Sequence, residues 1–267
     1  RSDNTEGDIR DAACVREVVR NVDVIFHSAA FVSVPQSMEE PQTCFDVNVT
    51  GTHLLLDAAR KAGVRRAVVA SSAAVYGESH TLPLVEETPL QPKSPYAISK
   101  RVNEQYAELF TNVFNFEVVA LRYFNVYGPR MDIYGAYTEV LIRWMERIAA
   151  GQPPLIFGDG RQTMDFVYIE DIARANILAA QADVTDEVFN VASGRETSLN
   201  DLAYTLLRVM DSNLKPEYGP ERKVNPVPRR LADVSKARRM LGFEARVGLE
   251  EGLCRLVEWW KEERSKA

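Results

Sequence analysis

A tyrosine and a lysine stand four residues apart in the stretch SPYAISK, residues 94–100. Ser94 suits the N-cap of a helix and Pro95 its first position, so Tyr96 and Lys100 would lie one turn apart on one helical face. A cation held near a phenol favours the phenolate, which lowers the tyrosine pKa from about 10 and makes it a base near neutral pH. An ordinary amphipathic helix with a surface lysine has the same spacing, so other parts of the chain have to decide.

The composition is that of a globular protein whose charge is mildly acidic. Of the 267 residues 46% are hydrophobic, and the net charge is −6, which offers no basic surface for nucleic acid or a membrane. Three widely spaced cysteines favour a reduced, cytoplasmic protein without a disulfide framework. The three histidines are scattered, so no metal site is expected, and no apolar run is long enough to span a membrane.

Short apolar runs alternate with helical patterns in the first half of the chain. Strands are expected at 23–30, 66–70 and 116–121, and helices at 43–62 and 95–114. This alternation, with nearly continuous apolar strands, favours an α/β fold in which a parallel sheet is covered on both faces. Ligands bind such sheets at the carboxyl ends of the strands, where Ser71, Ser72 and Tyr123 to Asn125 fall.

The second half of the chain is richer in turns. Helices are expected at 136–150, 169–180, 199–210 and 249–263, with a short strand at 155–157. We expect residues 1–128 to form a partial dinucleotide-binding domain, to which the segments around 155–192 return. Residues 129–267 would mainly form a smaller α/β lobe that binds the substrate.

Taken together, the motifs resemble the extended short-chain dehydrogenase/reductase family, in its nucleotide-sugar epimerase/dehydratase branch. The resemblance implies a Rossmann-like doubly wound sheet, NAD as the cofactor, a UDP-linked sugar as the substrate, and a homodimer formed through the helices at 43–62 and 95–114. The matching segments are GDI at 7–9, HSAA at 27–30, NVTGT at 48–52, SSAAVYG at 71–77, YAISK at 96–100, LRYFNVYGPR at 121–130, GDG at 158–160 and DFVY at 165–168.

The family also has a Gly-rich turn, between a first strand and a first helix, that holds the dinucleotide pyrophosphate. No such turn occurs in this chain, and the motif at 7–9 would end the third strand of the family's sheet. We therefore expect the sequence to be part of a longer polypeptide whose first βαβ unit lies upstream. The residue that selects NAD over NADP would lie there too, although the resemblance favours NAD.

The resemblance assigns Tyr96 as the catalytic base and acid, Lys100 as its electrostatic partner, and Ser72 as the hydroxyl that orients the substrate oxygen. Oxidation of a sugar alcohol requires that a proton be removed while hydride leaves the same carbon, which a tuned tyrosine can do. Ser72 also fits a role in satisfying backbone groups at a strand end. Ser71, which precedes it, is able to share or compete for the catalytic role.

The two residues after Ser72 discriminate within the branch. Nucleotide-sugar 4,6-dehydratases resemble Thr-Asp-Glu at this point, where the acids assist water loss, whereas Ala73 and Ala74 carry no proton. The segment instead looks like that of a 4-epimerase, which oxidises carbon 4 transiently and returns hydride to the opposite face. One alternative is a dehydratase of the same fold that uses other residues. Another is a non-catalytic NAD(P)-binding scaffold, against which intact Ser72, Tyr96 and Lys100 argue.

The resemblance also implies which residues contact the cofactor. Small side chains at 29 and 30 would let the backbone approach a dinucleotide closely, although they suit tight packing equally well. For Asn48 the alternative is a hydrogen bond inside the helix. For Tyr123 and Phe124 the alternative is a place in the core. The expected cofactor contacts are Asp8, Ile9, Ala29, Ala30, Phe31, Asn48, Ser71, Tyr96, Lys100, Tyr123 and Phe124.

Asn125 is the main candidate for a substrate contact, because its amide is able to donate to diphosphate oxygens. Phe157 is placed to stack on a nucleobase or to join the core. The diphosphate also needs cations, for which Arg161, Arg222, Arg229 and Arg230 are candidates and a solvated surface position is the alternative. Met164 stands where many members of the branch carry an arginine. The substrate contacts expected are Val34, Ser72, Tyr96, Asn125, Val140, Phe157, Arg161 and Arg229.

Overall fold

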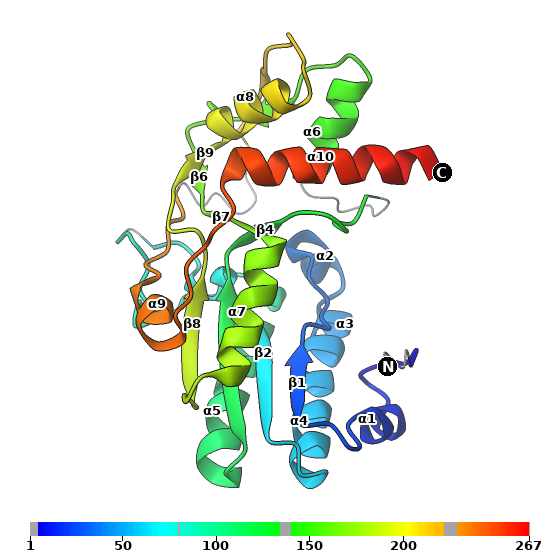
Figure 1. Ribbon diagram of the computed structural model, residues 1–267, viewed down its shortest axis with the longest axis vertical. Coiled ribbons are helices and arrows are strands. Elements are labelled where there is room, and N and C mark those ends of the chain that lie inside the picture. The colour runs from blue at the N-terminus through cyan, green and yellow to red at the C-terminus, as the bar shows by residue number, and fades with distance from the viewer. Residues whose placement is uncertain (1–4, 80, 134–139, 222–228, 267) are drawn as a thin grey trace.

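The computed structural model describes residues 5–79, 81–133, 140–221 and 229–266 (Figure 1). Its centre is a four-stranded parallel sheet in the order β1-β2-β3-β8. The strands are β1 (Val24–His27), β2 (Arg66–Ser72), β3 (Glu117–Tyr123) and β8 (Glu187–Val191). The predicted α/β class with a parallel sheet is therefore confirmed, and β8 is a strand that the sequence analysis did not predict.

Helices cover both faces of this sheet because each strand is apolar on both sides. α1 (Ala12–Val18), α4 (Gly51–Lys61) and α5 (Pro95–Phe114) share one core with β2. α7 (Ile169–Gln181) and α9 (Ser235–Leu241) share another core with β3 and β8 on the opposite face. In Figure 1, α7 lies in front of the sheet and α5 behind it.

One long helical run carries the predicted helix at 43–62, but it is not uniform. It begins with α3 (Pro41–Phe45), passes through a π-helical turn at Asp46–Thr50, and continues as α4. π-Helical turns are rare and occur frequently at functional sites. The short helix α2 (Val34–Glu39) precedes this run. Its N-cap, Ser33, accepts a hydrogen bond from the backbone N–H of Gln36.

A second group of elements lies beyond the carboxyl ends of the parallel strands (Figure 1). α6 (Val140–Ala149), α8 (Leu199–Val209) and α10 (Leu249–Lys266) enclose a core of their own, while residues 136–139 of the predicted helix lie outside the described residues. Three short strand pairs accompany them. These pairs are β4 (Asn125–Tyr127) with β7 (Phe166–Tyr168), β5 (Leu155–Phe157) with β10 (Glu217–Gly219), and β6 (Thr163–Met164) with β9 (Thr197–Ser198).

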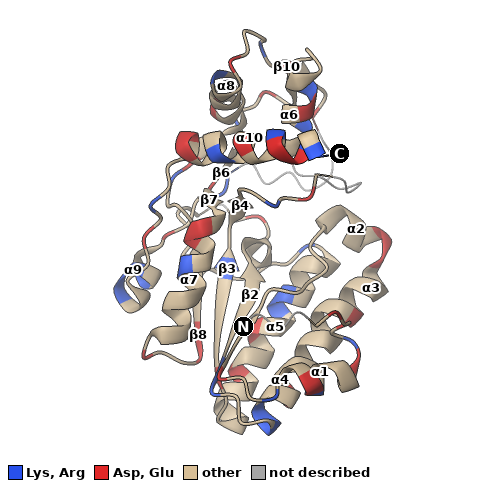
Figure 2. Cartoon of the chain, turned by 45° about the vertical axis from the view of Figure 1, so that its right-hand side comes forward, with Lys and Arg blue, Asp and Glu red and all other residues tan. Residues whose placement is uncertain are grey.

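Charged side chains of both signs alternate along the surface helices, as α10 illustrates in Figure 2. Along the described part of the chain, no helix combines the length and the apolar character needed to cross a bilayer. The same residues contain no group of three or more His, Cys, Asp or Glu side chains that is arranged to hold a metal ion.

Candidate active site

Lys100 connects α5 to the carboxyl end of β2. Its side chain is buried, and Nζ donates a hydrogen bond to the carbonyl oxygen of Ala70 at 2.8 Å. Nζ also lies 5.9 Å from the centroid of the Tyr96 ring. Ser94 caps the helix as predicted, because its Oγ accepts a hydrogen bond from the backbone N–H of Ala97 at 3.1 Å.

Generic helix and strand geometry places Tyr96 and Ser72 at a similar height along β2, whose last residue is Ser72. From Lys100 to Tyr96 the helix rises about 6 Å towards its N-terminus, and from Ala70 to Ser72 the strand rises about 7 Å towards its C-terminus. A helix that joins two parallel strands runs antiparallel to them. The N-terminal end of α5 and the C-terminal end of β2 therefore lie at the same end of the sheet. α5 also packs directly on β2 and on the 3₁₀ turn η2 (Ala73–Tyr76). Lys100 and Tyr96 are thus placed beside the end of β2, and the joint catalytic role of Ser72, Tyr96 and Lys100 stays a prediction.

The Ser72 hydroxyl is able to donate a hydrogen bond as well as cap the turn that follows the strand. Its Oγ accepts a hydrogen bond from the backbone N–H of Ala74 at 3.2 Å, which begins η2. Because the hydroxyl already accepts, its own O–H remains as a donor for a substrate oxygen. The Ser71 hydroxyl donates to Glu104 at 2.6 Å, so it is already occupied by a protein partner.

Burial sets the protonation of the two basic side chains near the end of β1 and β2. Burial lowers the pKa of Lys100 to about 8, so the ammonium is charged at neutral pH. Burial, together with the positive charge of Lys100, lowers the pKa of His27 to about 3. His27 is therefore neutral, and its Nε2 shares a hydrogen bond of 2.8 Å with the Thr52 hydroxyl. The positive charge beside Tyr96 resides on Lys100.

Asn48 joins the loop after β1 to the first turn of α5. Its Oδ1 accepts from the backbone N–H of Phe31 at 2.7 Å, and its Nδ2 donates to the Phe31 carbonyl at 3.0 Å and to Ser99 Oγ at 2.9 Å. Ser99 donates in turn to the Tyr96 carbonyl at 2.8 Å. The side-chain amide is thus occupied by protein partners, and the predicted contact of Asn48 with the cofactor stays a prediction.

The other predicted cofactor residues surround the same edge with varied exposure. Ala29 is exposed and Ala30 and Phe31 are half-buried, so this loop presents backbone to a ligand. Tyr123 donates its hydroxyl proton to Asn176 Oδ1 at 3.0 Å, and Phe124 packs in the core, as the alternative interpretation held. The remaining two predicted cofactor residues are Asp8 and Ile9. Asp8 forms an ion pair with Arg10, and Ile9 packs against Gly51.

Asn125 begins β4 and is held to the segment before β7. Its backbone N–H and its Nδ2 both donate to the Asp165 carbonyl, at 3.0 and 3.2 Å. The Asp165 carboxylate is itself fixed by donors from Ser193, Gly194 and Ala232, although burial raises its pKa. Val34, Val140 and Phe157 are half-buried at the starts of α2 and α6 and the end of β5.

The arginines differ sharply in their surroundings. Arg161 is 87% exposed with Asp159 at 3.7 Å, and Arg229 makes two hydrogen bonds of 2.7 Å to Glu196. Arg230 follows immediately, and its backbone N–H donates to the carbonyl of Thr163 beside Asp165. Arg230 is half-buried, and desolvation lowers the pKa of its guanidinium. Among the described residues no carboxylate forms an ion pair with it. The sequence offered Arg230 only as one of four candidates, because its partial burial is a property of the fold; Arg222 lies outside the described residues.

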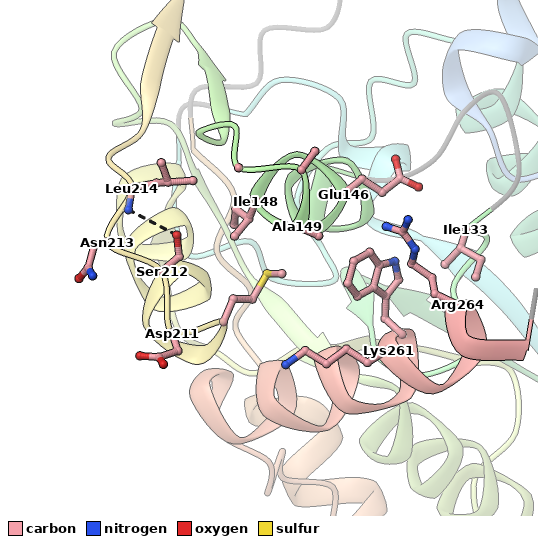
Figure 3. A pocket seen from close by; sticks show the side chains of 14 residues that line it. Ile133, Glu146, Ile148, Ala149, Asp211, Ser212, Asn213, Leu214, Lys261 and Arg264 are labelled. Atoms are coloured by element: carbon pink, nitrogen blue, oxygen red, sulfur yellow. Dashed lines mark hydrogen bonds between the residues drawn. The ribbon is translucent and has the colours of Figure 1, made fainter.

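A separate hollow of about 1140 Å³ lies between the C-terminal ends of α6 and α8 and the helix α10 (Figure 3). Glu146, Asp211, Lys261 and Arg264 are among the residues that line it. None of the predicted catalytic, cofactor or substrate residues within the described ranges contributes to its wall. The hollow is therefore distinct from the edge of the sheet where Ser72, Tyr96 and Lys100 meet.

Comparison with known proteins places these features in a family. A putative UDP-glucose 4-epimerase of Methanocaldococcus jannaschii is 37% identical over 98% of this chain and 85% of its own length. The crystal structure of a UDP-glucose 4-epimerase from Thermotoga maritima with UDP-glucose has a TM-score of 0.92 at 36% identity, covering 97% of this chain and 84% of that one. A UDP-N-acetyl-alpha-D-glucosaminuronate decarboxylase of Bacillus cytotoxicus is 33% identical over 95% of this chain and 81% of its own length.

The family model described as the NAD dependent epimerase/dehydratase family matches residues 1–192. This span includes the end of β2, the first turns of α5 and the loop after β1. NAD is the cofactor that goes with this family. The parallel sheet and the match over most of the chain agree, and the chain belongs to the NAD-dependent epimerase/dehydratase family.

Proposed function

We propose that this protein is a nucleotide-sugar 4-epimerase that acts on a UDP-linked hexose. The observation that supports the proposal is the contact of Lys100, one turn from Tyr96 on α5, with Ala70 at the carboxyl end of β2, where Ser72 is directly followed by Ala73 and Ala74. The triplet suits reversible oxidation of a sugar alcohol. The two alanines add no acid or base that a water-eliminating reaction would need.

The edge of the sheet has features that fit NAD. Among the described residues, the Ala70 carbonyl is the one acceptor that binds the Lys100 ammonium, which has three N–H groups. The remaining donors suit the ribose hydroxyls of a nicotinamide nucleotide. Ala29 and Ala30 would meet the phosphates with their backbone. When bound, NAD would supply the hydride chemistry that a change of configuration at carbon 4 of the sugar needs.

The protein's own part in the reaction is to move and hold a proton at the oxygen on carbon 4. Tyr96 takes the proton from this hydroxyl when the sugar is oxidised and gives it back when the sugar is reduced. The Lys100 ammonium stabilises the phenolate, and Ser72 donates a hydrogen bond to the same substrate oxygen. Epimerisation further requires the oxidised sugar to present its other face. The diphosphate therefore has to stay anchored while the sugar moves.

Asn125 and Arg230 are our candidates for that anchor. Both are attached to the segment Thr163–Asp165, since Asn125 donates to the Asp165 carbonyl and the Arg230 backbone donates to the Thr163 carbonyl. The half-buried Arg230 guanidinium has no carboxylate partner among the described residues, which leaves it suited to bind an anion. Arg161 and Arg229 are weaker candidates because both already lie beside carboxylates and are exposed.

Three carboxyl groups near the sheet edge bear on the dehydratase alternative. Glu86 accepts from the backbone N–H of Asn190 at 2.8 Å, Glu104 is paired with Arg122, and Asp165 accepts hydrogen bonds from three residues. Each carboxylate is thus held by the protein. A dehydratase would need one acid and one base that are free to reach the sugar ring, so these contacts favour the epimerase.

The decisive experiment follows the products by NMR after the full-length protein is incubated with UDP-glucose, UDP-galactose and UDP-N-acetylglucosamine. The proposal predicts that at least one substrate and its 4-epimer give the same mixture from either direction. Formation of a 4-keto-6-deoxy sugar would establish the dehydratase instead. A cofactor whose absorbance never changes with any sugar nucleotide would favour the scaffold.

We also infer a homodimer formed through α4 and α5. Ile98, Leu109 and Val113 are exposed on one face of α5, at spacings that keep them on the same side of the helix. An apolar face of this kind suits a second copy of the chain. Leu109→Glu together with Val113→Lys should convert the dimer to a monomer in light scattering, and an unchanged mass would contradict the inference.

A further inference from the structure

Glu104 is a buried carboxylate that sits one turn beyond Lys100 on α5. Its side chain is only 1% exposed, and its Oε1 accepts from Ser71 Oγ at 2.6 Å. Arg122 Nε donates to Oε1 at 2.8 Å and its Nη2 to Oε2 at 2.9 Å, which makes a two-pronged ion pair. Glu104 therefore ties a helix to the ends of two neighbouring strands.

The hydrogen bonds continue from this ion pair across the sheet. Arg122 Nη1 donates to the Tyr76 hydroxyl at 2.8 Å, and that hydroxyl donates to Asn190 Oδ1 at 2.6 Å. Asn190 Nδ2 donates to the carbonyls of Leu84 and Asp233 at 2.9 and 3.2 Å. All the side chains from Glu104 to Asn190 are buried. One chain of hydrogen bonds thus runs from α5 to the segment that follows Arg230.

A buried ion pair is a poor source of net stability, because desolvation of the charges offsets most of their attraction. What such a pair does supply is fixed geometry, since a guanidinium and a carboxylate meet in one orientation. Ser71 and Arg122 are direct neighbours in the β2–β3 register, and both bind the same carboxylate. The pair therefore fixes the last peptide units of β2 and β3 against α5.

We propose that Glu104 is a positioning residue for proton transfer: it fixes the end of β2, and with it Ser72, against the helix that carries Tyr96 and Lys100. The proposal rests on the proposed function, since it assigns Ser72 and Tyr96 to one substrate oxygen. Side chains of adjacent strand residues point to opposite faces. Because Ser71 is anchored to Glu104, the backbone of the next residue, Ser72, is held in place relative to α5, whichever face its hydroxyl lies on. A displacement of about 1 Å in such a group is able to cost about 100-fold in rate.

Two variants weaken the anchor by different amounts. Ser71→Ala removes only the hydroxyl that reaches Glu104, and Glu104→Gln removes the charge of the pair while keeping the shape. We expect kcat to fall severalfold in Ser71→Ala and about 10-fold or more in Glu104→Gln. The KM for the sugar nucleotide should stay within about twofold, because neither side chain belongs to the proposed diphosphate anchor.

The same two strands offer a matched control at their opposite ends. Arg66, at the start of β2, is buried and makes an ion pair of 2.8 Å with Glu117, at the start of β3. Glu117→Gln also removes a carboxylate from a buried arginine, yet it lies far from the carboxyl edge of the sheet. It should leave kcat within about twofold of the unaltered protein, whatever its effect on the melting temperature.

We would measure the rate at which saturating sugar nucleotide reduces the NAD of the holoenzyme. Crystal structures of each variant would accompany the kinetics. Expected are a slower reduction in Glu104→Gln and a changed separation between Ser72 Oγ and Tyr96 Oη. An unchanged rate in both Ser71→Ala and Glu104→Gln would overturn the proposal, as would an equal loss in Glu117→Gln. Failure of the proposed function is seen separately, since the unaltered protein would then reduce its cofactor without producing a 4-epimer.

Discussion

The ammonium of Lys100 donates to the carbonyl of Ala70, two residues before Ser72 ends β2. Together with the Ser71–Glu104 hydrogen bond, this contact ties α5 to the carboxyl end of β2. One helical turn and two strand residues cover nearly the same length, about 6 and 7 Å, so Tyr96 and Ser72 end at the same level. The spacing of the motif SPYAISK and the length of β2 are thus parts of the same geometry.

Lys100 should make the stability of the cofactor-free protein rise at alkaline pH. Its pKa is about 8 in the folded chain, whereas the ordinary value for a lysine side chain is 10.5, so between these values the unfolded chain binds the extra proton. The free energy of unfolding then increases with pH across this window, by up to about 3 kcal/mol. Below pH 8 both states are protonated and the dependence vanishes.

Urea unfolding from pH 7 to 10 checks this, comparing the unaltered protein with Lys100→Met. The difference in unfolding free energy should grow in favour of the unaltered protein as the pH passes 8. Lys61→Met is the control, because Lys61 is exposed on α4 and pairs with Asp57 at 2.6 Å. A difference between the unaltered protein and Lys100→Met that stays constant over this range would contradict the expectation.

His27 should make the protein sensitive to acid. Its pKa is lowered to about 3 by burial and by Lys100, whereas the ordinary value for a histidine is 6.5. Between these values the unfolded chain binds more protons, so stability is lost as the pH falls below 6.5. Acidification from pH 7 to 5 should cost about 2 kcal/mol through this residue.

The check is the pH dependence of unfolding in His27→Gln, which should be weaker than that of the unaltered protein by this amount. Gln is able to keep a hydrogen bond to Thr52 without titrating. His53→Gln, on the exposed side of α4, should retain the dependence of the unaltered protein. Equal acid sensitivity in both variants would show that His27 does not carry it.

Arg230 and Arg229 are neighbours in the chain, but their substitution should affect the KM for the sugar nucleotide differently. Arg230→Met should raise the KM for the sugar nucleotide about 10- to 100-fold, since a charge-assisted hydrogen bond contributes roughly 1.5–3 kcal/mol. Arg229→Met should change the KM less than about threefold, because Arg229 is bound to Glu196. Steady-state kinetics on the preferred substrate decide this, and the reverse order would transfer the diphosphate anchor to Arg229.

The sequence predicted the helices and strands of the parallel sheet well because their signals are local. Ser94 and Pro95 mark the start of α5 in the chain itself, and the apolar run at 66–70 lies within β2. β8 was not predicted, although its segment was expected to return to the first domain. Two of its residues are half-buried and its partner strand β3 lies far away along the chain, so no local pattern identifies it as the edge strand of this sheet.

The site could be predicted only in part, for a similar reason. The types and spacing of Tyr96 and Lys100 are visible in the sequence, and the fold brings them to Ser72. The sequence cannot show that Ser71 donates to Glu104 or that Arg230 is half-buried without a carboxylate partner among the described residues, because both depend on tertiary packing. The π-helical turn that carries Asn48 is likewise a product of packing between helices and loop.

Tyr96→Phe tests the chemistry most directly. It removes only the hydroxyl that is proposed to exchange the proton, so kcat should fall by about 10²- to 10⁴-fold while the bound NAD is retained. Tyr106→Phe is the control on the same helix, where the ring lies 5.3 Å from His53 and the residue is not part of the proposed site. Cofactor content, measured after denaturation, separates a loss of chemistry from a loss of binding. Full turnover in Tyr96→Phe would refute the assignment, because no other proposed group at this edge is able to replace the phenolate that Lys100 stabilises.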